Sequence, residues 1–175
     1  MTNSENLKPG NRLRPLSQPE ARRRNLPHIE EPGSVYFVTF TIANNRTLDT
    51  PAKNVVFDTL RFHSGTKYTL YACVVMATHA HAVIQPLREQ TTGSFYSLSQ
   101  IMHSIKSYSA NEINKLFGQK GSVWLAETYD RIIRDDSELK EKLGYVVNNP
   151  VKAGLVENPE DYCWLFCVGI SNSLP

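Results

Sequence analysis

The chain has 175 residues, 41% of them hydrophobic and 21% charged, with a formal net charge of +2 at pH 7. This length suits a single domain that buries its own core without disulfides or a structural metal. The three cysteines form no CxxC pair, no signal-peptide core opens the chain and no apolar run nears the roughly 20 residues of a membrane helix, so we expect a soluble, cytoplasmic protein without membrane association.

Residues 1–32 are predicted to form a basic N-terminal arm outside the core. They are rich in Pro, Arg and Asn, and turn-forming residues follow at 30–34. Residues 1–28 hold six Lys and Arg against two Glu, a charge of +4, which leaves −2 for the rest. A basic arm favours a polyanionic partner, although a solvated tail is the alternative. The arginines expected to contact DNA are Arg12, Arg14, Arg22, Arg23 and Arg24.

The first half of the predicted domain, which spans residues 33–175, contains three strands and a helix. β-branched and aromatic residues throughout 34–42 predict a strand that is buried on at least one face. Apolar residues at near-helical spacing predict a helix over 51–64. Two further strand-like runs, 67–77 and 79–87, have only a short turn between them. We expect these two runs to pair as a hairpin.

The second half adds a helix, a strand and a last helix. The segment 97–118 carries an apolar stripe, with Ser97 or Ser99 able to cap the helix. Strand composition returns over 122–134, and a helix is expected over 136–150, where it ends at a proline. This order fits an α+β fold, a ferredoxin-like antiparallel sheet with helices on one face and an appended C-terminal helix.

Two histidines interrupt the apolar strand "MATHAHAVIQP" at 76–86. Because side chains alternate along a strand, His79 and His81 project to one face and can share a ligand. Tyr145 and Asn149 stand four residues apart in the last predicted helix, and so on one face of it. A divalent ion held by two imidazoles and an amide oxygen keeps open positions for a phosphodiester, which the Tyr145 oxygen could attack.

Three segments together resemble the single-tyrosine HUH transposases, in particular the REP-associated tyrosine transposases. They are "THAHAV", "VWLAETYDRIIRD" and "YVVNNPVKAGLVENPEDYCW", and the likeness spans residues 33–165 in matching order. The run "NNPVKAGLV" after a tyrosine is the most specific part. The chain departs from the family where the usual Pro-Asn before the first histidine is Ala77-Thr78, and where a small Ala80 separates the histidines.

The resemblance implies that His79, His81 and Asn149 are metal ligands and that Tyr145 is the catalytic nucleophile. It implies Mg²⁺ or Mn²⁺ as the cofactor, and a monomer or homodimer that acts on single-stranded DNA with a REP-like hairpin. The expected reaction is nicking through a 5′-phosphotyrosine intermediate with a free 3′-OH. Joining is the reverse attack, as DNA transposition and recombination require. The family's fold is the ferredoxin-like sheet expected above.

Other residues offer alternative or additional roles. Tyr108, on the predicted helix 97–118, is a rival nucleophile, but a DNA-facing or packing role is preferred for it because the family motif matches at Tyr145. Arg131 and Arg134 lie on the last predicted strand and are expected to bind DNA phosphates, although solvated charges are equally common there. Lys152, which follows the "NNP" turn, is a similar candidate.

Two other kinds of protein fit parts of the sequence. A zinc site would use the three cysteines, but free cysteines are more often buried hydrophobes than ligands. A non-catalytic nucleic-acid-binding module would bind a strand through aromatic residues of the sheet and would need neither the histidines nor Tyr145. The aromatic residues considered for this role are Tyr36, Phe37 and Phe40.

Overall fold

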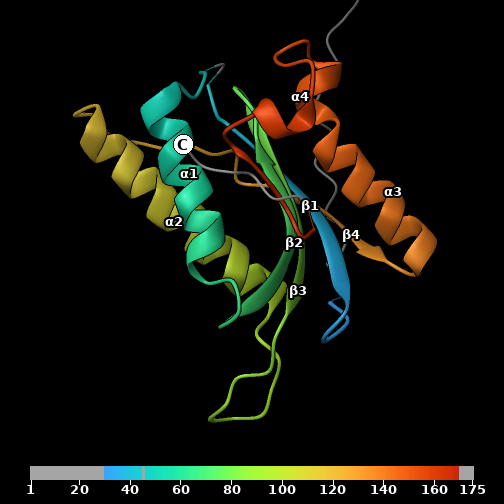
Figure 1. Ribbon diagram of the computed structural model, residues 1–175. Coiled ribbons are helices and arrows are strands. Elements are labelled where there is room, and N and C mark those ends of the chain that lie inside the picture. The colour runs from blue at the N-terminus through green and yellow to red at the C-terminus, as the bar shows by residue number, and fades with distance from the viewer. Residues whose placement is uncertain (1–29, 45, 170–175) are drawn as a thin grey trace, which may run out of the picture.

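A five-stranded antiparallel sheet forms the centre of the molecule (Figure 1). The computed structural model describes residues 30–44 and 46–169, so the five arm arginines lie outside the described residues. The spatial order is β4-β1-β3-β2-β5. The strands are β1 (Val35–Thr41), β2 (Tyr68–Val75), β3 (His79–Pro86), β4 (Tyr129–Ile133) and β5 (Leu165–Cys167).

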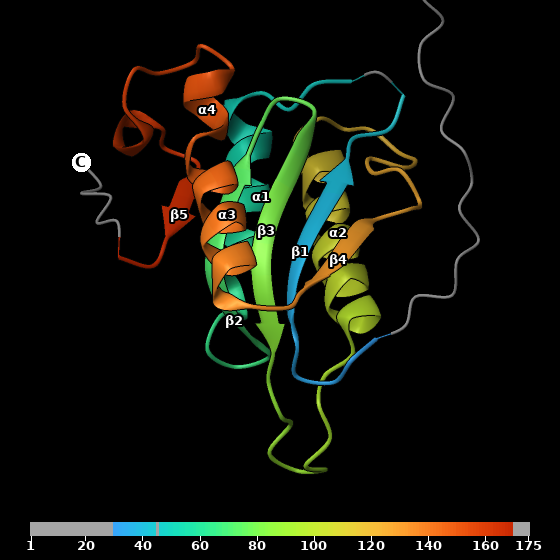
Figure 2. The ribbon, with the colours of Figure 1, turned by 90° about the vertical axis from the view of Figure 1, so that its right-hand side faces the viewer.

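Helices α1 (Thr50–Phe62) and α2 (Leu98–Leu116) cover one face of the sheet (Figure 2). The main core lies between them and the sheet and includes Val38, Phe40 and Ile84. Both helices begin at side-chain caps, because Asp49 accepts a hydrogen bond from the Ala52 amide and Ser97 accepts one from the Gln100 amide. Ser97, rather than Ser99, is therefore the residue that caps α2.

Helix α3 (Asp136–Val147) covers the opposite face and packs against β2, β3 and β5 (Figure 2). A smaller core fills this layer, and it includes Phe37, Val83 and Val146. The α+β fold with an antiparallel sheet and an appended C-terminal helix is thereby confirmed. Strand alternation explains the two cores, since odd-numbered residues of β1 and β3 turn toward α3 and even-numbered residues turn toward α1 and α2.

Two strand predictions differ from the structure. The strand expected over 122–134 is regular only over β4, and the preceding segment is irregular apart from an isolated bridge between Trp124 and Ile42. The short β5 was not expected, because its strand conformation depends on pairing with β2. Within the described residues, no helix is both long and apolar enough to cross a membrane.

The helix expected over 136–150 is divided. Helix α3 ends at Val147, Asn148 caps it, and the short helix α4 (Asn149–Lys152) follows. Pro150 explains the break, because it has no amide hydrogen to donate to the preceding turn. A 3-10 helix (Pro159–Asp161) then leads to β5.

Candidate functional site

The candidate site lies on the α3 face of the sheet, where β3 carries two neighbouring imidazoles. His79 and His81 project to the same face, as predicted, and their ring centroids are 4.7 Å apart in an edge-to-face arrangement. His81 is only 5% exposed and stacks on Phe37 of β1 at 5.4 Å. His79 is half-buried. The sheet and α3 therefore hold the two rings in a largely desolvated position.

Each imidazole has one nitrogen next to a threonine hydroxyl. The Thr39 hydroxyl lies 2.8 Å from His81 Nδ1, and the Thr78 hydroxyl lies 3.0 Å from His79 Nδ1. When a threonine oxygen accepts the Nδ1 proton, the Nε2 lone pair of that ring is left for a ligand. His81 Nε2 is buried and has no hydrogen-bond partner among the described residues.

Burial also keeps both imidazoles neutral. It lowers the pKa of His79, and it lowers the pKa of His81 to about 4, with a further lowering from the neighbouring His79. Neutral imidazole is the form that binds a metal ion. The pair is therefore ready to accept a cation at neutral pH.

Tyr145 of α3 lies directly beside this pair. Its ring centroid is 5.2 Å from that of His81 and 5.7 Å from that of Phe37, in both cases edge-to-face. The residue is 40% exposed, so its hydroxyl can meet a molecule from solvent. The Lys152 ammonium lies 5.7 Å from the ring centroid of Tyr145 and adds a positive charge at the same place. A tyrosine, two neutral histidines and a lysine thus converge from β3, α3 and α4.

Asn149 belongs to a different helix from the one that the sequence predicts. Tyr145 and Asn149 were expected on one face of one helix, but the break at Asn148 places Asn149 at the start of α4. Asn149 is half-buried, and its side chain has no hydrogen-bond partner among the described residues. Its amide oxygen is therefore not engaged elsewhere in this part of the chain.

The residues at this site fit a divalent cation. The fit rests on the buried Nε2 of His81, which has no partner within residues 30–44 and 46–169, and on the lowered pKa of both rings. The described residues contain no group of three or more His, Cys, Asp or Glu side chains that could hold a metal ion. The third ligand expected from the sequence, the amide oxygen of Asn149, is a neutral oxygen of the kind that would complete such a set.

The predicted DNA-binding arginines of the last strand have different surroundings. Arg131 Nε lies 2.8 Å from a carboxylate oxygen of Glu138 on α3. The Arg134 side chain is exposed at the end of β4, while its backbone amide donates to the second oxygen of Glu138. Arg131 thus connects the edge strand to α3, and Arg134 is open to solvent.

The structure argues against three alternatives that the sequence offers: Tyr108 as the nucleophile, a zinc site, and base stacking on aromatic residues of the sheet. Tyr108 is 58% exposed, but it lies on α2 beside the groove between α1 and α2, across the sheet from the histidines. Burial raises the pKa of the Cys73 thiol to about 12, which disfavours a zinc-binding thiolate. The three sheet aromatics proposed to stack on bases are buried between layers, so that form of the non-catalytic module is wrong; they are Tyr36, Phe37 and Phe40.

Two contributors to the site were missed in the sequence. Thr39 is the residue that orients His81, and Phe37 stacks on the same ring. Both become visible only with the strand register, in which Thr39 pairs with His81 and Phe37 with Val83. The sequence contains the alternation of β1 but no signal for its alignment with β3.

Comparison with known proteins supports the same fold. No protein-family model matches the chain, and no curated protein matches it. Among solved structures, the REP-associated tyrosine transposase bound to a REP hairpin is similar at 20% identity, over 77% of each chain, with a TM-score of 0.58. The chain shares the fold of that transposase. A bacterial tRNA(His) guanylyltransferase-like protein in complex with ATP is similar at 10% identity, over 75% of this chain and 66% of its own, with a TM-score of 0.48.

Proposed function

We propose that this protein nicks and rejoins single-stranded DNA at hairpins, with Tyr145 as the nucleophile and a divalent cation as cofactor. The observation that carries the proposal is the partly exposed Tyr145 beside two neutral histidines, one of which has a buried nitrogen that no described residue bonds. The solved transposase of the same fold is bound to a REP hairpin, and this makes a DNA hairpin the first substrate to test.

In the proposed reaction, the Tyr145 oxygen attacks the phosphorus of a phosphodiester, and the bond from phosphorus to the 3′ oxygen breaks. The phenol loses one proton and the leaving 3′ oxygen gains one, so the protons balance. The products are a 5′-phosphotyrosine and a free 3′-OH. Because one phosphodiester replaces another, a 3′-OH can reverse the attack and rejoin DNA without a nucleotide cofactor.

His79, His81 and Asn149 would hold Mg²⁺ or Mn²⁺. When bound, such an ion withdraws charge from the phosphate oxygens and makes the phosphorus easier to attack. Thr39 and Thr78 hold the imidazoles in the orientation that presents Nε2. The Lys152 ammonium beside Tyr145 would attract the negatively charged phosphodiester to the phenol.

The test is a denaturing gel of the full chain incubated with a hairpin-bearing single-stranded oligonucleotide and Mn²⁺. We expect a protein–DNA adduct that survives denaturation, and none when a chelator is in excess. An adduct of equal yield in excess chelator would contradict the role of the metal. If no adduct forms with any hairpin that the protein binds, the nicking proposal is wrong.

A further inference from the structure

An exposed tyrosine on the edge strand lies in the same row of the sheet as the candidate site. Tyr129 of β4 pairs with Thr39 of β1, and Thr39 pairs with His81 of β3. Residues paired across antiparallel strands lie on the same face, so the three side chains form a row on the α3 side. Two strand spacings separate Tyr129 from His81, or roughly 10 Å between their backbones.

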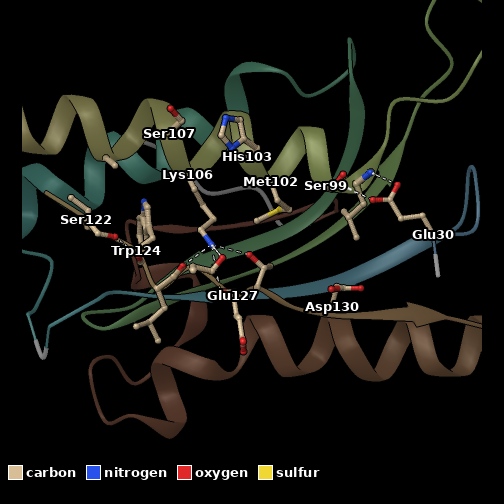
Figure 3. A pocket seen from close by; sticks show the side chains of 16 residues that line it. Glu30, Ser99, Met102, His103, Lys106, Ser107, Ser122, Trp124, Glu127 and Asp130 are labelled. Carbon is tan, nitrogen blue, oxygen red and sulfur yellow. Dashed lines mark hydrogen bonds between the residues drawn. The ribbon is translucent and has the colours of Figure 1, made fainter. Parts of the chain in front are cut away.

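The ring of Tyr129 is open to solvent on this face. The residue is 55% exposed. The next residue, Asp130, turns to the other face and lines the groove beside α2 (Figure 3). Helix α3 lies over β2, β3 and β5, and the edge strand β4 stays outside its cover (Figure 2). One flat group of a bound polymer could therefore reach the ring of Tyr129 while the next group of the same polymer reaches Tyr145.

The segment that leads into Tyr129 is held firmly. The Lys106 ammonium lies 2.7 Å from the carbonyl oxygen of Leu125, 2.9 Å from that of Ala126 and 3.1 Å from the hydroxyl of Thr128 (Figure 3). On the other side, the β4 residues pair with β1. The backbone under Tyr129 is thus fixed before any ligand arrives, which lowers the entropy cost of binding.

We propose that Tyr129 is a stacking platform for an unpaired base close to the phosphodiester at Tyr145, an inference that rests on the function proposed above. Single-stranded nucleic acid is bound by aromatic rings on which bases stack, together with positive charges that follow the backbone. Here the ring is Tyr129, and the positive charge on the same side is Lys152 near Tyr145. The ligand is therefore a base of the single-stranded DNA that flanks the hairpin.

The experiment measures binding without cleavage, in the full chain carrying Tyr145→Phe. The probes are one hairpin oligonucleotide with unpaired tails and a series in which each tail position in turn is abasic. On the intact probe, Tyr129→Ala should weaken binding by roughly 5- to 150-fold, which corresponds to the 1 to 3 kcal/mol of one base stacked on an aromatic ring. Tyr129→Phe keeps the ring and should bind within about twofold of the parent.

Tyr108→Ala is the matched control, because Tyr108 is 58% exposed but lies across the sheet. It should leave affinity unchanged. One abasic position near the cleavage site should lower the affinity of the parent and abolish the further effect of Tyr129→Ala, since the two changes remove the same contact. An effect of Tyr129→Ala that is equal on all probes, or no larger than that of Tyr108→Ala, would overturn the platform.

This outcome is separable from that of the proposed function. If the abasic pattern appears but the chain with Tyr145 intact forms no adduct, the platform stands and the nicking reaction is wrong. If the adduct forms but Tyr129→Ala binds every probe as tightly as the parent, the nicking reaction stands and the platform is wrong.

Discussion

Replacing Lys106 by methionine tests how the edge of the sheet is held. The lysine extends from α2 across the groove in Figure 3, and three short hydrogen bonds use all the protons of its ammonium. The acceptors of the three short bonds are the carbonyl oxygens of Leu125 and Ala126 and the hydroxyl of Thr128, and the carbonyl oxygen of Glu127 lies farther away, at 3.4 Å. Methionine keeps the aliphatic stem and removes the charge and all of these hydrogen bonds.

The expected cost follows from those bonds. A hydrogen bond to a charged group contributes about 1.5 to 3 kcal/mol. The sum of three such contributions overestimates the loss of stability, because water can replace the ammonium at part of this half-buried site. An ordered lysine also loses up to about 2 kcal/mol of side-chain entropy, which its replacement restores. We expect the free energy of unfolding to fall by about 2 to 3 kcal/mol, or the melting temperature by about 4 to 12 °C.

The assay is urea unfolding of the full chain, with Lys115→Met as the control on the same helix. In the described part of the chain, Lys115 forms an ion pair with Glu112, at 2.6 Å, and because solvent screens such an exposed pair, its loss should leave the unfolding midpoint nearly unchanged. Equal midpoints for Lys106→Met and Lys115→Met would refute the idea that the ammonium holds the segment before β4.

Three further predictions concern the proposed reaction. Tyr145→Phe should abolish the DNA adduct on a denaturing gel and leave hairpin affinity within about twofold, because only the attacking oxygen is lost; Tyr108→Phe should keep the adduct, and the reverse pattern would give the role to Tyr108. His79→Ala or His81→Ala should remove both cleavage and the rise in melting temperature that Mn²⁺ gives the parent, and an unchanged rise in either variant would exclude that histidine as a ligand. Deleting residues 1–29 should flatten the slope of log affinity against log salt by about 0.7 for each lost phosphate contact, and equal slopes would show that the arm is a solvated tail.

Much of the fold could be predicted because local patterns agree with the final structure. The β-branched runs recover β1, β2 and β3, and the apolar stripe with a capping serine recovers α2. The three-residue β5 could not be found, since its conformation depends on pairing with β2. The segment 122–128 has strand composition but forms only an isolated bridge, not a continuous hydrogen-bonded ladder with another strand. The Lys106 ammonium binds the carbonyl oxygen of Leu125 in this segment instead.

The candidate site was predictable only in part. Alternation along one strand is a local rule, and it placed His79 and His81 on one face. The contact of Thr39 with His81 depends on the register between β1 and β3, which are far apart in the sequence. Helical spacing placed Tyr145 and Asn149 together, but Pro150 interrupts the hydrogen bonding that this spacing assumes.

The most direct test of the central claim is to identify the residue that carries DNA. The adduct is formed with Mn²⁺, digested with nuclease and trypsin, and analysed by mass spectrometry for a peptide with an added nucleotide. We predict the nucleotide on the peptide 143–152, attached through a 5′ phosphate to Tyr145. A nucleotide on the peptide 107–115, which contains Tyr108, or on any residue other than Tyr145 would contradict the proposed mechanism.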